Sequence, residues 1–357
     1  MSDTLRTPHF PALLIPFLII VLIFVSPSES SADGIHKMVI RADLLKVKSL
    51  IETNPGLVNS RDNEGKTPLA VAASRLKQFL PLEMFEIEQR KSIISLLIAN
   101  GAEISDLTEA IAAGNMEKVS LFIQENAQAE SHKDGFQTPL HCAAFWGQKE
   151  ISRLLISKGA DVNARGPEGT PLHLSAMLGY SGVTELLLSQ GAHVDDRDDS
   201  GQTPLQMAVK MGSIIYYDPR DRSFHTMEPH LPAEKTNEFV EVIRLIVASG
   251  ADVNRRQQKN GRADLTPLHI ASIRGCRRTA ELLITAGSKL NLKDDTYGFT
   301  PLHCASANGN SEVVKLLISM GADLNLKDRN GTTPLKAAIE KGQKDMADLL
   351  RSHGARE

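Results

Sequence analysis

Thr138-Pro139-Leu140-His141-Cys142-Ala143-Ala144, followed by Phe145-Trp146-Gly147, is a block that returns along the chain. From Thr138 onward its copies start 32 to 34 residues apart, except for one interval of 63 residues, and an earlier copy starts at Thr67. The later copies start at Thr170, Thr203, Thr266, Thr300 and Thr333. Self-similarity at a fixed period predicts stacked units of supersecondary structure.

The block has the chemistry of a helix start. The threonine hydroxyl can accept a hydrogen bond from a free N–H of the first turn, and proline at the first helical position sacrifices no hydrogen bond. A second helix follows with apolar residues at helical spacing, for example Ile151, Leu154 and Leu155. Glycines suited to a left-handed helix end come next, at positions 159, 191, 250, 287, 321 and 354. One helix pair cannot bury its apolar face alone, so the pairs must stack.

The Thr-Pro-Leu-His block and its period resemble the ankyrin repeat. The resemblance covers nearly everything after residue 33 and implies an all-α solenoid of about nine helix-turn-helix units with hairpin fingers. Two units are degenerate: residues 34–66 lack the Thr-Pro-Leu-His block, and residues 105–137 replace Thr-Pro-Leu with Ser105-Asp106-Leu107. Polar residues on the last helix are those expected of a C-terminal cap.

Composition narrows the function classes. A net charge of −3 argues against general nucleic-acid binding, which needs a basic face. Cys142 and Cys304 fall at the same repeat position four repeats apart, beyond the reach of a disulfide, and Cys276 at the start of a second helix is poorly aimed at Cys304, so we expect no disulfide framework.

Residues 1–32 precede the array. The apolar run 12–25 is shorter than a membrane span, and Ser30-Ser31-Ala32 fits a cleavage site, so the first interpretation is a signal peptide. The alternative is an uncleaved membrane anchor. We therefore expect residues 33–357 to be exported, to the periplasm or the medium, or else held at a membrane through residues 12–25.

The array offers little for catalysis or metal binding. His141, His173, His269 and His303 lie one or more repeats apart, too far to share a metal ion, and the resemblance assigns them to hydrogen bonds that brace the turns. An inserted segment, residues 213–236, carries His225 and His230 without any recognised ligand spacing. We expect no enzyme activity, no metal and no cofactor.

The functional prediction concerns two residues of each repeat. They lie between the pair of small residues that follows the Thr-Pro-Leu-His block, Ala143-Ala144 in the copy quoted above, and the next glycine. In ankyrin repeat proteins they point into the concave groove and contact partners, so the resemblance assigns the same role here. The predicted protein-binding residues include two tyrosines of the insertion and are Phe145, Trp146, Met177, Leu178, Met211, Tyr216, Tyr217, Ile273 and Arg274. The competing interpretation is that these apolar side chains pack inside the protein or beneath the insertion.

The sequence thus predicts a monomeric, non-catalytic scaffold that binds an unidentified protein through its concave face. The alternative is a secreted, host-directed effector or inhibitor that blocks a target enzyme. An enzyme with its chemistry in residues 213–236 is a third, disfavoured interpretation.

Overall fold

The computed structural model describes residues 32–74, 83–125, 138–212, 215–218, 223–226, 233–257 and 265–357. Its 18 α-helices form nine consecutive pairs, as the sequence predicts. In each pair the odd-numbered helix is called inner and the even-numbered helix outer. Repeats 1 to 3 contain α1 (Ala32–Ile40) with α2 (Leu44–Thr53), α3 (Pro68–Ala73) with α4 (Glu83–Ala99), and α5 (Leu107–Ala112) with α6 (Met116–Glu125). A short 3₁₀ turn, η1 (Pro55–Asn59), follows α2.

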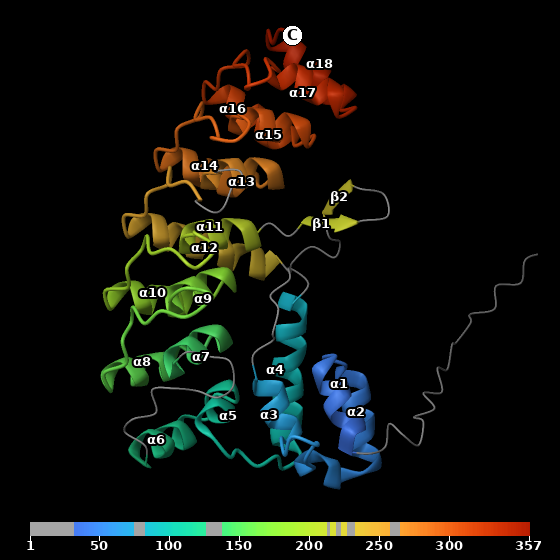
Figure 1. Cartoon of the computed structure of the whole chain (residues 1–357), viewed down its shortest axis with the longest axis vertical. Coiled ribbons are helices and arrows are strands. Elements are labelled where there is room, and N and C mark those ends of the chain that lie inside the picture. The colour runs from blue at the N-terminus through green and yellow to red at the C-terminus, as the bar shows by residue number, and fades with distance from the viewer. Residues whose placement is uncertain are drawn as a thin grey trace, which may run out of the picture.

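The remaining six pairs stack in sequence order (Figure 1). Repeats 4 to 6 contain α7 (Pro139–Trp146) with α8 (Lys149–Ser157), α9 (Pro171–Met177) with α10 (Ser181–Ser189), and α11 (Pro204–Met211) with α12 (Ala233–Ala248). Repeats 7 to 9 contain α13 (Pro267–Arg274) with α14 (Arg277–Thr285), α15 (Pro301–Ala307) with α16 (Ser311–Ser319), and α17 (Pro334–Glu340) with α18 (Lys344–Ser352).

The helix ends follow the predicted chemistry. The threonine hydroxyl accepts from the third helical N–H in α3, α7, α11, α13, α15 and α17. After the outer helices, the six predicted glycines all have φ between +86° and +95°. A residue with a Cβ atom is strained in that region, so glycine is the appropriate helix end.

The block histidines brace each inner helix to the next repeat, as the resemblance implies. In His173, Nδ1 accepts from the Thr170 N–H at 3.0 Å, which places the ring proton on Nε2; Nε2–H then donates to the Gln202 carbonyl at 3.3 Å. His269 and His303 make the same pair of bonds, to the carbonyls of Phe299 and Thr332. Only a neutral imidazole accepts at Nδ1 and donates at Nε2.

We predict that this bracing makes the fold sensitive to acid. Burial lowers the pKa of His173, His269 and His303. Above about pH 6.5 these histidines are neutral in both the folded and the unfolded chain. Below that pH the unfolded chain takes up protons that the folded chain does not, so the free energy of unfolding decreases as the pH is lowered. The limiting slope is about 1.4 kcal/mol per pH unit for each histidine. Urea titrations between pH 8 and pH 5 measure it.

Repeat 6 supplies the control for that prediction. Its block has Gln206, whose Oε1 accepts from the Thr203 N–H and whose Nε2 donates to the Arg255 carbonyl, both at 2.9 Å. Because glutamine makes the same two bonds without titrating, the triple variant His173→Gln, His269→Gln, His303→Gln should fold at pH 8 and show a flatter pH dependence. An unchanged slope would assign the acid sensitivity to other groups.

Repeat 1 is less degenerate than its sequence indicates. Although it lacks the Thr-Pro-Leu-His block, His36 is buried and its Nε2 lies 2.8 Å from the Lys66 carbonyl. This is the bond that the block histidines make to the next repeat. In repeat 3 the corresponding position is Glu109, which is 1% exposed and accepts from the N–H and hydroxyl of Ser105. Burial raises the pKa of this carboxyl.

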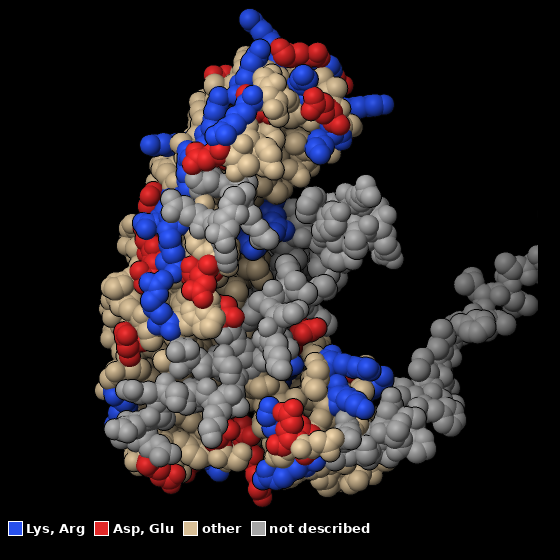
Figure 2. Space-filling model, in the orientation of Figure 1, with Lys and Arg blue, Asp and Glu red and all other residues tan. Residues whose placement is uncertain are grey.

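A ladder of cationic side chains joins the fingers, the turns that precede the inner helices. Arg165 donates to the Arg197 carbonyl, Arg197 to that of Arg256, Arg256 to that of Lys293, and Lys293 to that of Lys327. Each cation therefore bonds to the same position of the next finger. These four basic side chains therefore hold neighbouring fingers together. Acidic side chains lie among the cations on the face shown in Figure 2.

The insertion contains one element that the sequence analysis does not predict. Strands β1 (Ile215–Asp218) and β2 (Ser223–Thr226) pair antiparallel, with Tyr216 opposite His225 and Tyr217 opposite Phe224. The pair projects from the stack beside α11 and α12 (Figure 1). The fold is a helical solenoid with this single two-stranded ribbon among the residues that the structure describes.

The N-terminal repeats depart from the regular stack. Figure 1 shows α4 along the long axis of the array, whereas the later helices lie across that axis. Between α4 and α5 only residues 100–106 remain, so repeat 2 has no full finger to set its orientation. Repeat 2 also has a long connection between its two helices, because α3 ends at Ala73 and α4 begins at Glu83.

The predicted targeting segment falls almost entirely outside the described residues, which begin at Ala32. Among the helices that the structure describes, none combines the length and the apolar character needed to cross a bilayer. The export and anchor interpretations therefore remain predictions.

Candidate functional site

The predicted contact residues of the middle repeats are buried. Exposed fractions are 1% for Phe145, 2% for Trp146 and for Leu178, 6% for Met177 and 8% for Met211. Phe145 and Trp146 pack edge to face, with ring centroids 5.1 Å apart. The expected exposed apolar stripe is therefore wrong for these five residues, which we call the covered stretch: their side chains complete the core of repeats 4 to 6.

The same two positions open toward solvent in the C-terminal repeats. Ile273 and Arg274 are partly exposed, Ala307 is partly exposed, and Asn308, Glu340 and Lys341 are exposed. We call these six residues the open stretch. In Figures 1 and 2 the outline of the molecule is indented where α13 and α15 end, on the side of this stretch.

Ile273 and Arg274 are thus the predicted contact residues that the structure leaves accessible. Burial lowers the pKa of the Arg274 guanidinium, but arginine still keeps its charge at neutral pH. Arginine is enriched at the buried centres of protein interfaces, which are also more apolar than the rest of the surface. The side chains of Tyr216 and Tyr217 lie outside the described residues, so their predicted role is untested.

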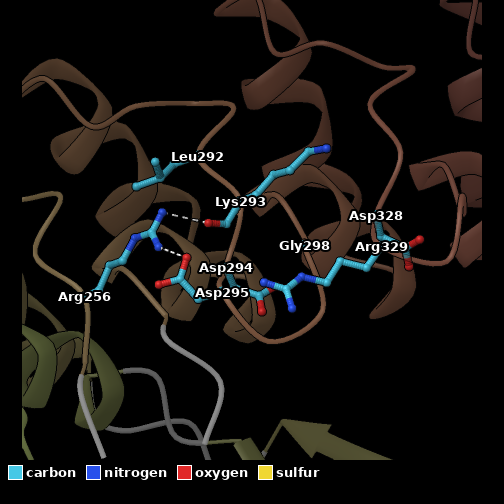
Figure 3. A pocket seen from close by; sticks show the side chains of 8 residues that line it. All are labelled: Arg256, Leu292, Lys293, Asp294, Asp295, Gly298, Asp328 and Arg329. Atoms are coloured by element: carbon cyan, nitrogen blue, oxygen red, sulfur yellow. Dashed lines mark hydrogen bonds and ion pairs between the residues drawn. The ribbon is translucent and has the colours of Figure 1, made fainter. Parts of the chain in front are cut away.

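A pocket of about 470 Å³ lies between the fingers of repeats 7 to 9 (Figure 3). Arg256 lines one side and forms an ion pair with Asp295, and Arg329 lines the other. The Asp294 carboxylate accepts the backbone N–H groups of Thr296, Tyr297 and Phe299, so it holds the turn in place. With Arg256 paired to Asp295 and the Asp294 carboxylate engaged by the backbone, the pocket fits a polar side chain of a partner better than a reaction centre.

Tyr297 is a surface aromatic residue that the sequence analysis did not select. It is 50% exposed, stacks on Phe299 with centroids 5.3 Å apart, and its carbonyl accepts from the Arg329 N–H at 2.9 Å. The signal available in the sequence was the finger itself, Asp294-Asp295-Thr296-Tyr297-Gly298-Phe299, which carries two aromatic residues where the next finger has Asn330 and Thr332.

The described residues hold little that could act on a substrate. Among them, no group of three or more histidine, cysteine or acidic side chains could share a metal ion. None of the three cysteines, all of which the structure describes, forms a disulfide. Burial raises the pKa of Cys304 to about 12, which keeps it in the unreactive thiol form at neutral pH.

A stack of helix pairs with bonded fingers and a partly open inner face defines a solenoid repeat protein. A family model described as ankyrin repeats (3 copies) matches residues 83–166, 230–328 and 268–356, and a second, described as ankyrin repeat, matches residues 169–199. The chain belongs to the ankyrin repeat family.

Relatives and solved structures agree with that assignment. Mouse Rabankyrin-5 is 29% identical over 220 residues, which is 57% of this chain but only 17% of Rabankyrin-5. Human protein phosphatase 1 regulatory subunit 27 is 36% identical over 76 residues, covering 21% of this chain and 49% of that protein. The NF-kappa-B inhibitor cactus of Drosophila melanogaster is 45% identical over 69 residues, covering 19% of this chain and 13% of cactus.

Two ankyrin repeat domains of known structure share the fold. The human ASB11 domain superposes with a TM-score of 0.55 at 21% identity, covering 71% of this chain and all of that domain. The Bcl-3 domain, described as a unique member of the IkappaB protein family, gives 0.54 at 27% identity over 70% of this chain and 98% of that domain.

Proposed function

We propose that this chain is a non-catalytic scaffold that binds a partner protein through the open stretch. The observation that carries the proposal is the change along the inner face. In repeats 4 to 6 five of the six side chains at these positions are buried and Lys210 is exposed, whereas from Ile273 and Arg274 onward all six are partly or fully exposed. The exposed Tyr297 and the finger pocket, which lie in the same C-terminal repeats, provide further groups for a protein contact.

Relatives named as a regulatory subunit and as an inhibitor support a role in binding other proteins. They do not identify the partner, since each match covers a short part of both chains. The alternative of a secreted inhibitor depends on export. Mass spectrometry of the mature N-terminus distinguishes the cases: a start near Asp33 supports export, and an intact Met1 or Ser2 in the membrane fraction supports an anchor.

Site-specific photo-crosslinking tests the binding surface. p-Benzoylphenylalanine placed at Ile273 or Asn308, in the cells that make the protein, should yield a crosslinked protein partner. The control position is Met320, which is 45% exposed beyond the end of the outer helix α16. Crosslinks at Ile273 and Asn308 but not at Met320 support the proposal; crosslinks only at Met320, or none at any position, contradict it.

A further inference from the structure

Repeat 1 exposes two aliphatic side chains where its inner helix meets its outer helix. Ile40, the last residue of α1, is 56% exposed, and Leu45, in the first turn of α2, is 73% exposed. They are the two most exposed large apolar side chains of the described residues. Single exposed apolar residues are common on protein surfaces, so the place of these two in the repeat has to decide whether they have a role.

The place of Leu45 is not apolar in the other repeats that can be compared. Leu45 comes three residues after Ala42, and Ala42 stands where six other repeats have a glycine with φ between +69° and +73°. The residues three positions after those glycines are Glu117, Glu150, Gly182, Arg278, Glu312 and Asp345. The outer helices of this array therefore begin with solvated residues, and Leu45 departs from that pattern without gaining burial.

The turn between α1 and α2 holds the two aliphatic residues in a fixed arrangement. Ala42 has a φ of +53° and is the one non-glycine residue with a positive φ in the part of the chain that the structure describes. The N–H groups of Ala42 and Asp43 donate to the carbonyls of Val39 and Met38, each at 3.0 Å. A residue with a Cβ atom keeps this conformation only where its surroundings enforce it, and such strain concentrates at functional positions.

Cations surround the exposed aliphatic residues. Lys37 and Arg41 lie three residues before and one residue after Ile40, both are exposed, and neither has an ion pair with a described residue. The two acidic side chains described in this helix pair have cation partners of their own, at 3.6 Å in Asp43–Lys46 and at 3.9 Å in Glu52–Lys48. The surface around Ile40 and Leu45 is therefore positive, because two cations remain without a neutralising partner.

We propose that Lys37, Ile40, Arg41 and Leu45, which we call the repeat-1 corner, bind an anionic lipid surface. The aliphatic side chains enter the boundary between headgroups and acyl chains, and the two cations bind lipid phosphates. This inference goes beyond the proposed function and does not depend on it.

Two observations favour a lipid surface over a protein as the occupant. The corner contains no aromatic residue, whereas the centres of protein interfaces are enriched in tyrosine, tryptophan and phenylalanine. The apolar run 12–25 ends six residues before Ala32, where α1 begins. Six residues reach at most about 20 Å, so a membrane contact of that run would bring repeat 1 to the same surface.

The place of repeat 1 in the array allows both kinds of binding at once. Figure 1 shows α1 and α2 at the edge of the array, apart from the column of helices from α7 to α18. In Figure 2 lysine and arginine side chains gather over α1. A lipid surface that binds this edge leaves the open stretch in repeats 7 to 9 accessible to a partner protein.

A tryptophan placed in the corner tests the inference in the full chain. In Leu45→Trp the new indole is exposed to water, and vesicles of phosphatidylcholine and phosphatidylglycerol in equal parts should shift its emission to the blue. Lipids brominated on their acyl chains should quench it. Trp146, the only native tryptophan, is 2% exposed and supplies a constant background. The matched control is Met320→Trp, at a position that is 45% exposed in repeat 8 and should show neither effect.

A charge variant tests the part played by the cations. Lys37→Gln together with Arg41→Gln, in the Leu45→Trp chain, should lower the ratio of bound to free corner about twentyfold, because each cation near an anionic membrane favours binding about fivefold. The fraction of the emission shift that remains gives this ratio. The control pair is Lys341→Gln with Lys344→Gln, two exposed lysines at the corresponding turn of repeat 9, which should leave the shift unchanged.

The outcomes separate this inference from the proposed function. A shift at position 45 that needs phosphatidylglycerol and both cations supports it. No shift at position 45, an equal shift at position 320, or an equal shift with vesicles of phosphatidylcholine alone would overturn it. So would p-benzoylphenylalanine at Leu45 that yields a protein adduct and no lipid adduct in cells, because the corner would then bind a protein. None of these results changes the crosslinking test at Ile273.

Discussion

Trp146→Ala is expected to lower the free energy of unfolding of the middle repeats by about 3–5 kcal/mol, the usual cost of removing a fully buried tryptophan. Trp146 is 2% exposed, packs on Phe145 and is among the largest fully buried side chains of the described core. Its loss leaves a cavity between the end of α7 and its surroundings. Urea denaturation followed by circular dichroism measures the effect, because the variant has no tryptophan left to observe.

Two further variants serve as comparisons for the stability loss expected of Trp146→Ala. Tyr297→Ala removes another large aromatic side chain, but one that is 50% exposed, and should cost less than about 1 kcal/mol. Trp146→Phe keeps part of the ring and deletes the unpaired N–H, so it should retain much of the lost stability. A loss below about 1 kcal/mol for Trp146→Ala would show that the middle repeats relax around the cavity.

The repeat architecture could be predicted because its determinants are local. Thr138 and Pro139 start a helix, a glycine such as Gly159 with φ +93° ends one, and His173 bonds to a residue less than one period away. The helix start, the helix end and the histidine hydrogen bond each depend on residues within the same repeat or the next one. The same residues recur in many repeats, so the sequence pattern predicts these features. His36 makes the same contact to the next repeat although no Thr-Pro-Leu sequence precedes it, so the motif alone does not identify it.

The burial of Trp146 could not be predicted in this way. Period and composition identify which side chains point inward, but they do not say what lies opposite them. The contact between Lys91 and Tyr180 joins repeats 2 and 5, a separation that no repeat pattern encodes.

Arg90 is the second residue whose replacement should have a large effect. Its side chain is 3% exposed, and the guanidinium donates to the carbonyls of Val71, Ala72 and Ser74 near the end of α3 and of Ile40 at the end of α1, at 3.2–3.4 Å. One cation thus satisfies carbonyl groups of two helix C-termini, where a positive charge is also favoured by the helix dipoles.

Arg90→Met should cost about 3 kcal/mol, because it keeps the packing of the chain stem but leaves buried carbonyls without donors. Arg90→Lys is the informative comparison: a single ammonium group does not span two helix ends as a planar guanidinium does, so it should recover less than half of the loss. Hydrogen exchange of the α1 and α3 amides, read by mass spectrometry, localises the effect. Equal protection in the native chain and in Arg90→Met would show that apolar packing alone holds α1 and α3 against α4.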